Sequence, residues 1–281
     1  MKIGLIGVGL IGGSMALKLK EKKFTSEIIA FDKSDVHLQT AKERQIIDRI
    51  SSFEGLIKNS QIIIIALPVE ATKVVLLEVL DRISDKQIVM DVGSTKHEIS
   101  KIVDNHPKRK NYVASHPMWG TEHSGPNAAT VDAFSNRAAV ICNPEDSYDF
   151  AIEYVKQIYE NLDMNILYMD AEKHDMHTAY ISHISHITSY ALANTVLEKE
   201  REEDTIFQLA SSGFSSTVRL AKSHPEMWVP IFKQNKENVL DVLNEHISQL
   251  KKFKSALEKE NFEFLEELIL NANKIRGILD K

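Results

Sequence analysis

The sequence of 281 residues contains a single cysteine, Cys142. One thiol cannot form an intrachain disulfide, and it cannot build a zinc site from several thiolates. No apolar run approaches the roughly 20 residues that a membrane-spanning helix needs. The first residues are typical of a strand rather than of a basic segment before a cleavage site. We therefore expect a cytoplasmic protein without disulfides.

The sequence also lacks an excess of positive charge. It contains 34 lysines and arginines and 40 aspartates and glutamates, which gives a formal net charge of −6. Proteins that bind nucleic acids generally carry a basic surface that releases counterions from phosphates. The composition, 43% hydrophobic and 26% charged, is that of an ordinary globular protein long enough for two domains. General nucleic-acid binding is thereby disfavoured, and a small-molecule ligand is expected.

The strongest local signal lies in the first fourteen residues. An apolar run over residues 2–6 predicts a buried strand, and Gly7-x-Gly9-x-x-Gly12 follows it and leads into a helical pattern. Gly7 permits a tight turn, Gly9 lets the backbone approach a pyrophosphate, and Gly12 lets the helix lie close to the strand. The unpaired N–H groups at the start of the helix then face an anion. The alternative is a chance glycine turn.

An acidic residue completes this dinucleotide pattern. Asp32 ends a second apolar run and stands twenty positions after Gly12, where a carboxylate can bond both ribose hydroxyls of an NAD adenosine. We therefore predict an NAD site and no metal. The residues assigned to the cofactor are Gly7, Gly9, Leu10, Ile11, Gly12, Asp32, Leu67, Pro68 and Ser94.

The chain as a whole divides into two patterns. From residue 1 to about 168, strand-length apolar runs alternate with helical patterns, which is typical of a parallel sheet covered by helices on both faces. Beyond residue 170 no strand pattern recurs. We predict an α/β Rossmann-type domain over residues 1–169 and an all-α domain over residues 170–281. The expected strands include 46–50, 61–67, 87–91, 111–115, 138–142 and 165–168, and the expected helical stretches include 172–201, 205–209, 217–223, one starting near Pro230, and 262–279.

The last helices are apolar over more than one face, which exceeds what a single buried stripe requires. Dimerisation through this domain explains the surplus, and a large intrachain core is the alternative. We favour a homodimer. The residues concerned are Leu240, Val242, Leu243, Ile247, Leu250, Phe262, Phe264, Leu265, Leu268 and Ile269.

Polar and special residues gather at the ends of the predicted strands, and in a parallel sheet these ends form one edge where ligands bind. His116 is such a residue, and Pro117 after it holds it in an extended or turn conformation, where an imidazole can act as a general base for an alcohol. A loop histidine that caps backbone groups is the alternative. Ser94 follows a strand and precedes a helix, so that it can be an N-cap, share the substrate oxygen with His116, or do both.

The helical domain has its own histidines. His183 and His186 lie on one helix face with Tyr190, and His174 and His177 repeat the same spacing earlier. Two histidines at this spacing can form half a metal site, but no HExxH motif, cysteine pair or clear third ligand accompanies them. A substrate pocket is the better supported interpretation.

A small-residue loop that starts at Ser211 and includes Gly213 runs into a helix that carries Arg219, and Trp228 follows nine residues later. A guanidinium can hold a substrate carboxylate through two hydrogen bonds, which suits an anionic metabolite. A surface ion pair is the alternative, and the spacing alone does not decide. Glu122, six residues after His116, can orient a second group or gate a cleft, or simply face solvent.

Together these motifs resemble those of the prephenate dehydrogenases of tyrosine biosynthesis. The similarity runs in order over most of the chain, and its most specific element is His-Pro-Met-x-Gly-Thr-Glu. It implies a Rossmann domain, a helical dimerisation domain, and NAD(P)-dependent oxidative decarboxylation of prephenate to 4-hydroxyphenylpyruvate. The motifs are residues 7–14, 91–96, 115–125, 182–186 and 213–219.

The resemblance also implies roles for single residues. His116 takes the place of the histidine that engages the ring 4-hydroxyl, and Ser94 that of the serine that supports it. Substrate contacts are implied for Arg219 at a carboxylate, Glu122 at the pocket entrance, His183, His186, Gly213 and Trp228. The family often has Leu-Pro between the two helical histidines, where this chain has Ile184-Ser185.

Three other functions remain as alternatives. Arogenate differs from prephenate only in an amine that replaces a ketone, and no residue decides between the two. A hydroxy-acid or imine dehydrogenase on the same scaffold commonly uses a lysine in the helical domain and has no place for the His116 motif. A non-catalytic NAD-binding module needs neither His116 nor Arg219.

Overall fold

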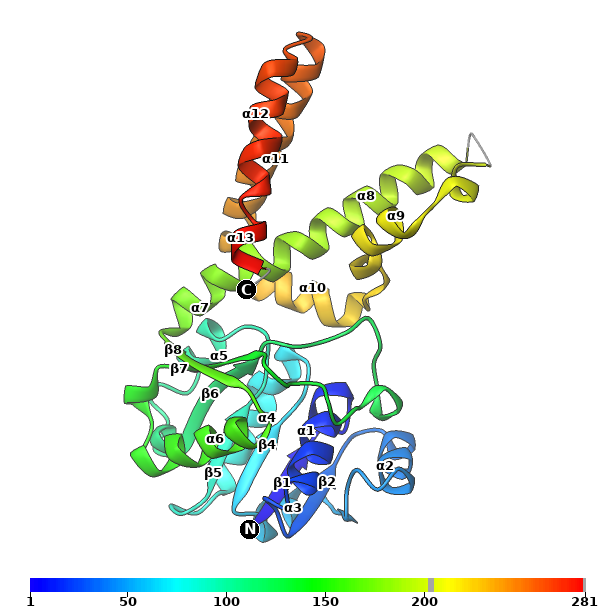
Figure 1. Ribbon diagram of the computed structural model, residues 1–281. Coiled ribbons are helices and arrows are strands. Elements are labelled where there is room, and N and C mark those ends of the chain that lie inside the picture. The colour runs from blue at the N-terminus through cyan, green and yellow to red at the C-terminus, as the bar shows by residue number, and fades with distance from the viewer. Residues whose placement is uncertain (202–204, 280–281) are drawn as a thin grey trace. The chain divides into compact units, whose positions relative to one another are not determined.

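The computed structural model describes residues 1–201 and 205–279 (Figure 1). The chain separates into two compact units, Met1–Asn235 and Lys236–Lys281. All of the site residues expected from the sequence lie in the first unit. The functional division between residues 169 and 170 stays a prediction.

The first unit is built on one eight-stranded sheet of order β3-β2-β1-β4-β5-β6-β7-β8. Its strands are parallel except for the pair β6 and β7, which runs antiparallel. The sheet is therefore mostly parallel, as expected for a Rossmann-type domain. The strands are β1 (Lys2–Ile6), β2 (Glu27–Phe31), β3 (Arg49–Ile50), β4 (Ile62–Ile65), β5 (Ile88–Asp91), β6 (Tyr112–Pro117), β7 (Ala138–Cys142) and β8 (Asn165–Met169).

Strand β6 continues two residues further than the sequence predicted. We expected the strand to stop at Ser115, but His116 and Pro117 pair with Val140 and Ala139 of β7. The strand continues through Pro117 because β7 pairs with it on both sides of the proline. Directly after Pro117, the Met118 N–H donates to the Ala138 carbonyl of β7. His116 is therefore held in a strand rather than in a loop.

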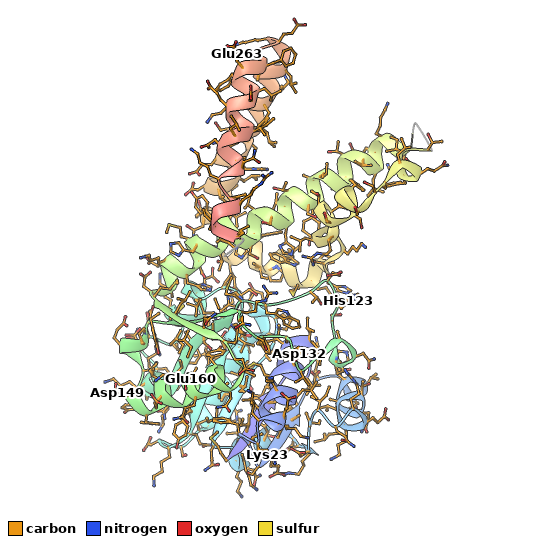
Figure 2. The ribbon with its side chains drawn as sticks, in the orientation of Figure 1. Lys23, His123, Asp132, Asp149, Glu160 and Glu263 are labelled. Carbon is orange, nitrogen blue, oxygen red and sulfur yellow. The ribbon has the colours of Figure 1, made fainter. Side chains whose placement is uncertain are left out.

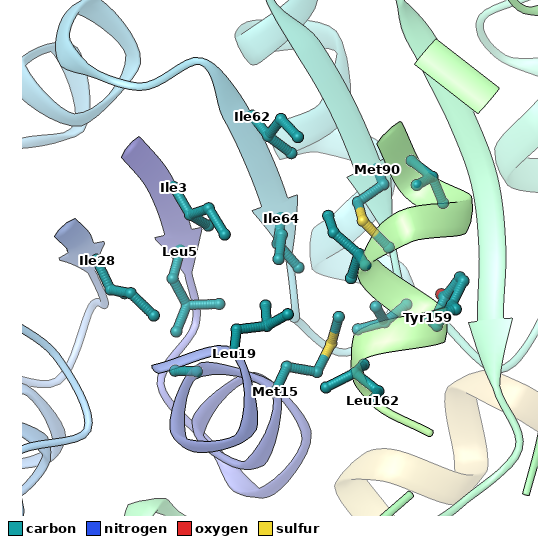
Figure 3. Close-up of a cluster of buried hydrophobic side chains, with 14 of the residues drawn as sticks. Ile3, Leu5, Met15, Leu19, Ile28, Ile62, Ile64, Met90, Tyr159 and Leu162 are labelled. Atoms are coloured by element: carbon teal, nitrogen blue, oxygen red, sulfur yellow. The ribbon is translucent and has the colours of Figure 1, made fainter. Parts of the chain in front are cut away.

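Both faces of the sheet are buried under helices. Ile62 and Ile64 pack into the apolar cluster that contains Met15 and Leu19 (Figure 3). The alternating Ile63 and Ile65 belong to the cluster on the opposite face. Each fully buried isoleucine contributes about 1.5–3 kcal/mol of transfer free energy. The helices of this region are α1 (Leu10–Glu21), α2 (Asp35–Glu43), α3 (Phe53–Asn59), α4 (Val69–Arg82), α5 (His97–Lys101) and α6 (Asp149–Asn161), with short turns η1 (Arg109–Asn111), η2 (Pro126–Ala128) and η3 (Pro144–Asp146).

After β8 the chain is helical, as predicted. The stretch expected over residues 172–201 is interrupted by a π-helical turn, and two other expectations are wrong. The small-residue segment before Arg219 is itself helical, and Pro230 lies inside a helix instead of starting one. The elements are α7 (Ala171–Thr178), the π-turn η4 (Ala179–His183), α8 (Ile184–Glu200), η5 (Ile206–Leu209), α9 (Ser212–Thr217), η6 (Arg219–Lys222) and α10 (Pro225–Gln234).

The second unit contains α11 (Lys236–Glu258), α12 (Phe262–Asn273) and α13 (Arg276–Leu279). Most of the large apolar side chains singled out in the sequence stay exposed here, including Leu240, Leu250, Phe262 and Ile269. Whether a second copy or an intrachain core covers these side chains stays a prediction. Among these residues, no helix is long and apolar enough to cross a membrane.

Candidate active site

The glycine turn after β1 has the geometry that the sequence predicted. Gly7 has a φ of +94°, and a Cβ on it would lie 2.3 Å from the Ala66 carbonyl oxygen. A Cβ on Gly12 would lie 2.3 Å from the Gly7 oxygen, whereas the space in front of Gly9 is open within 4 Å. Helix α1 begins after Gly9 without a side-chain cap, so the first-turn N–H groups of Leu10 and Ile11 have no partner within the helix. The cradle therefore fits a pyrophosphate.

Asp32 is held in a fixed orientation beside this cradle. Its Oδ2 accepts the Val8 N–H at 2.9 Å, and its Oδ1 accepts the Ser34 N–H at 2.9 Å. Each carboxylate oxygen keeps a further lone pair for another donor. The arrangement therefore fits a ribose diol at the end of β2.

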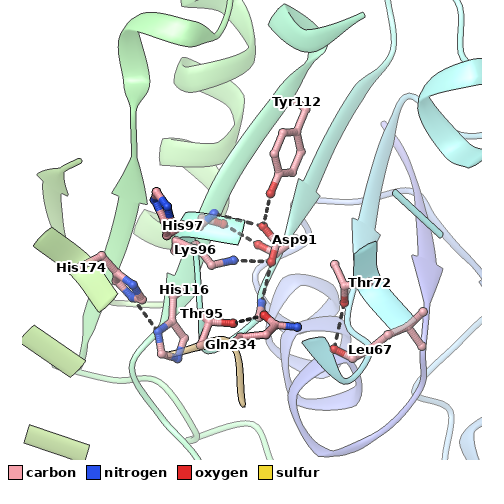
Figure 4. Close-up of polar contacts among 12 residues, drawn as sticks. Leu67, Thr72, Asp91, Thr95, Lys96, His97, Tyr112, His116, His174 and Gln234 are labelled. Carbon is pink, nitrogen blue, oxygen red and sulfur yellow. Dashed lines mark hydrogen bonds and ion pairs between the residues drawn. The ribbon is translucent and has the colours of Figure 1, made fainter. Parts of the chain in front are cut away.

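The chain after β4 closes over the same turn. The Leu67 side chain lies 2.9 Å from the position of a Gly7 Cβ. The Thr72 hydroxyl donates to the Leu67 carbonyl (Figure 4). It also lies within hydrogen-bond distance of the Pro68 carbonyl, and these contacts fix the approach to α4. Leu67 and Pro68 thus lie where the sequence placed them, at the carboxyl edge next to the glycine turn.

Ser94 does not cap the helix that follows it. The N-cap position of α5 belongs to Lys96, two residues later, so the capping interpretation is wrong. The start of α5 is capped from another element, because the Asp175 carboxylate of α7 accepts the N–H of Lys96 at 2.7 Å and that of His97 at 2.9 Å. Ser94 stays on the loop after β5, the strand adjacent to the one that carries His116.

A buried ion pair underlies this edge of the sheet, and nothing in the sequence pattern predicted it. Lys96 and Asp91 are both fully buried, and the Lys96 ammonium donates to the Asp91 carboxylate. The other Asp91 oxygen accepts the Tyr112 hydroxyl at 2.6 Å (Figure 4). Burial and the Asp91 charge raise the pKa of Tyr112 well above its ordinary value, so its hydroxyl remains a donor.

His116 is half-buried at the carboxyl end of β6. Its Nδ1 lies 2.9 Å from Nε2 of His174 on α7 (Figure 4). Burial lowers the pKa of His116 well below its ordinary value of 6.5, and positive charge on His174 when it is protonated, or on Lys96, lowers it further. The imidazole is therefore neutral at pH 7 and has a nitrogen lone pair that can accept a proton.

The π-turn explains why His174 and His183 share a side of the helix. Two residues nine positions apart in an uninterrupted α-helix point about 180° apart, because each residue turns the helix by about 100°. A π-turn bonds five residues back and absorbs one extra residue, which reduces this angle to about 80°. Both histidines are consequently 1% exposed, whereas His177, which the sequence paired with His174, is exposed.

His183 and His186 meet Trp228 of α10. The His186 ring stacks on the indole with centroids 3.4 Å apart, and the His183 ring lies edge-on to it at 5.9 Å. Burial lowers the pKa of His183 to about 4 and also lowers that of His186. Asn235 donates to Nδ1 of His183 at 3.1 Å, so the neutral ring carries its proton on Nε2. The indole Nε1 is buried without a partner among the described residues.

Arg219 pairs with Glu122. One nitrogen of its guanidinium lies 3.1 Å from a carboxylate oxygen of Glu122. Glu122 belongs to the long loop between β6 and β7, which also carries His123 (Figure 2). A backbone hydrogen bond and the arginine lower the pKa of Glu122. The Arg219 charge also lowers the pKa of His186, so the arginine belongs to the same surroundings as the histidines. Gly213 lies in the exposed helix α9, six residues before Arg219.

The structure thus links the sheet edge to the helices through a contact that the sequence did not predict, between His116 and His174. Asp175, Lys96 and Asn235 were also missed. The one available signal in the sequence was the carboxylate of Asp175 directly after His174. Its role could be recognised only from the folded positions of the π-turn and α5. Among residues 1–201 and 205–279, no three histidine, cysteine, aspartate or glutamate side chains gather to hold a metal.

Comparisons with known proteins agree with this geometry. Residues 15–168 match the family model for the prephenate dehydrogenase nucleotide-binding domain, and residues 170–271 match that for its dimerization domain. Prephenate dehydrogenase of Bacillus subtilis is 34% identical over 93% of this chain and 71% of its own. Cyclohexadienyl dehydrogenase of Zymomonas mobilis is 28% identical over 98% of this chain and 94% of its own.

Among solved structures, prephenate dehydrogenase of Aquifex aeolicus in complex with hydroxyphenyl propionate and NAD+ superposes with a TM-score of 0.90. It is 26% identical, and the match covers 100% of this chain and 98% of that one. The two family models and the Bacillus relative together decide the family. The chain is therefore a dehydrogenase of the prephenate dehydrogenase family, with a nucleotide-binding domain followed by a dimerization domain.

Proposed function

We propose that the protein catalyses the NAD-dependent oxidative decarboxylation of prephenate to 4-hydroxyphenylpyruvate. The observation that carries the proposal is the neutral His116 imidazole, held by β6 at the sheet edge where the glycine turn and Asp32 also lie. The Bacillus relative, named a prephenate dehydrogenase, supports the choice of substrate.

The cofactor in this proposal is NAD. The open space at Gly9, the uncapped start of α1 and the fixed Asp32 carboxylate are the features that would hold its pyrophosphate and ribose. NAD+ in the Aquifex structure supports the same choice. When bound, the dinucleotide supplies the hydride acceptor for the hydrogen that leaves the ring carbon.

His116 is the proposed general base. It accepts the proton of the ring hydroxyl while the hydrogen on the same carbon leaves as hydride, and Ser94 shares the hydroxyl oxygen from the neighbouring loop. Loss of the ring carboxylate as carbon dioxide completes an aromatic ring. The contribution of the protein is mainly placement, since alignment of the reacting groups is worth several kcal/mol.

Arg219 is the proposed carboxylate anchor, with Glu122, His183, His186, Gly213 and Trp228 around the substrate. The ion pair with Glu122 shows that the guanidinium already holds a carboxylate in this arrangement. A substrate carboxylate would exchange for Glu122 or bind to the remaining donors of the fork.

Replacing Arg219 by alanine is expected to raise KM about 10-fold or more with a smaller change in kcat, because a hydrogen bond between charged groups is worth about 1.5–3 kcal/mol. Steady-state kinetics with prephenate at saturating NAD measures this. Lys222→Ala removes a neighbouring positive charge from the same turn η6 and should leave KM near the wild-type value. An unchanged KM in the Arg219 variant would remove this residue from the substrate site.

Cofactor preference should follow from Asp32. We expect kcat/KM for NAD to exceed that for NADP by about tenfold or more, because the 2′-phosphate would face a carboxylate that two N–H groups hold in place. Asp32→Ser should narrow this ratio, and Asp35→Ser, an exposed acid at the start of α2, should not. Equal efficiency of the wild-type protein with both cofactors would contradict the assignment, whatever Lys33 and Ser34 contribute.

The proposed assembly is a homodimer through the helical domain. The match to the family's dimerization domain and the exposed apolar residues of α11 and α12 support it. Sedimentation of the purified protein at micromolar concentration should give twice the mass of the chain.

The function is tested by mixing purified protein with NAD and either prephenate or arogenate. We expect reduced nicotinamide and carbon dioxide to form in equal amounts with prephenate. Turnover of arogenate but not of prephenate would make arogenate the substrate and leave the family assignment unchanged. Binding of NAD without consumption of either compound would favour a non-catalytic module.

A further inference from the structure

A chain of hydrogen bonds connects His116 to a carboxylate in the helical part of the first unit. His116 Nδ1 lies 2.9 Å from His174 Nε2, and His174 Nδ1 lies 2.7 Å from Asp175 Oδ1. His174 and Asp175 are 1% and 2% exposed, so water does not compete for these bonds. His116 comes from β6, and His174 and Asp175 come from α7. The fold brings the two elements together, and Figure 4 shows the resulting contact between His116 and His174.

The direction of each bond follows from the carboxylate. Asp175 accepts the N–H groups of Lys96 and His97, so it serves as an acceptor for all its neighbours. The proton between His174 and Asp175 therefore sits on Nδ1 of His174. When the His174 ring carries this one proton on Nδ1, its Nε2 is an acceptor.

The same reasoning carries over to His116. An acceptor at Nε2 of His174 requires a donor at Nδ1 of His116, and the neutral His116 ring then has its lone pair on Nε2. We propose that His174 is a positioning residue that fixes the tautomer of His116, with Asp175 as its anchor, and so leaves Nε2 as the proton-accepting atom. This inference rests on the proposed role of His116 as the general base.

Asp175 also connects this chain of hydrogen bonds to a second part of the site. Its two oxygens bind the start of α5, directly after the loop that carries Ser94. The carbonyl of Asp175 also accepts from the Asn235 amide at 2.6 Å, and that amide donates to His183 as well. The side chain that orients His116 through His174 therefore also holds the loop on which the proposed partner of His116 lies. The geometry of the two proposed catalytic groups depends on one buried carboxylate.

The test uses the whole protein with 15N-labelled histidine, in the absence of substrate and near neutral pH. The ring nitrogens of His116 are assigned by comparison with the His116→Asn variant, and their shifts show which nitrogen carries the proton. We expect Nδ1 to be protonated and Nε2 to be unprotonated in the wild-type protein. A proton on Nε2 of His116 would overturn the proposal whether or not the His174 variant folds, and this readout is independent of the substrate that the enzyme uses.

A pair of variants tests the consequence. His174→Leu should shift His116 toward the other tautomer and lower kcat about 10- to 100-fold, with KM for NAD nearly unchanged. His177→Leu is the matched control, because this histidine lies one turn further on the same helix and is exposed. It should keep the wild-type spectrum and rate. A wild-type His116 spectrum and a wild-type kcat in the His174 variant would contradict the positioning role.

Discussion

Replacing His116 by asparagine is expected to lower kcat by about 10²-fold or more, while the affinity for NAD stays nearly intact. The physical reason is that asparagine retains a polar side chain at this position but cannot accept a proton. The imidazole is ready for this step because burial holds its pKa well below 6.5 and keeps it neutral. Steady-state rates with prephenate and direct titration of NAD binding measure the two quantities separately.

His123→Asn is the matched control for this prediction. It changes the same residue type on the exposed loop that follows β6, and it should leave both kcat and NAD affinity unchanged. If the His116 variant lost NAD binding in the same proportion as activity, His116 would have a structural role at the sheet edge instead of a role in proton transfer.

Replacing Lys96 by methionine is expected to lower the free energy of unfolding by about 3–5 kcal/mol. The substitution removes the positive partner of Asp91 and leaves a fully buried carboxylate with only the Tyr112 hydroxyl and backbone N–H groups as donors. Denaturant titration of both proteins, followed by circular dichroism, measures the difference.

The double variant Lys96→Met with Asp91→Asn removes both charges and should recover part of this loss, because the uncompensated buried charge is gone. An exposed ion pair serves as a second comparison, and Lys254→Met, which breaks the pair with Glu258 on α11, should cost less than about 1 kcal/mol. A loss below about 1 kcal/mol for Lys96→Met would contradict the proposed importance of the buried pair.

Much of the sheet could be predicted because its strands are short apolar runs with clear ends. The four successive isoleucines of β4 face alternate clusters, and the glycine turn after β1 has the conformation that its residues require. The local sequence does not predict where a strand ends when pairing with a neighbouring strand decides its length. Pro117 ends a strand by its own chemistry, yet β7 extends β6 past it and holds His116 in place.

The site in the helical region was harder to predict, because its geometry depends on a change in helical register. The sequence paired His174 with His177 by spacing, but the π-turn and the packing against β6 bury His174 and leave His177 exposed. Asp175 carried no recognisable motif, since its partners are backbone N–H groups of a helix about 80 positions earlier. Residues that act through backbone contacts across the fold leave little trace in a single sequence.

The most direct measurement is a crystal structure of the protein with NAD and an unreactive analogue of the ring substrate that keeps its hydroxyl. We predict that the hydroxyl oxygen lies about 2.6–3.2 Å from Nε2 of His116 and that a substrate carboxylate contacts Arg219. A hydroxyl held by another group, with His116 and Arg219 opening onto separate surfaces, would contradict the proposed chemistry.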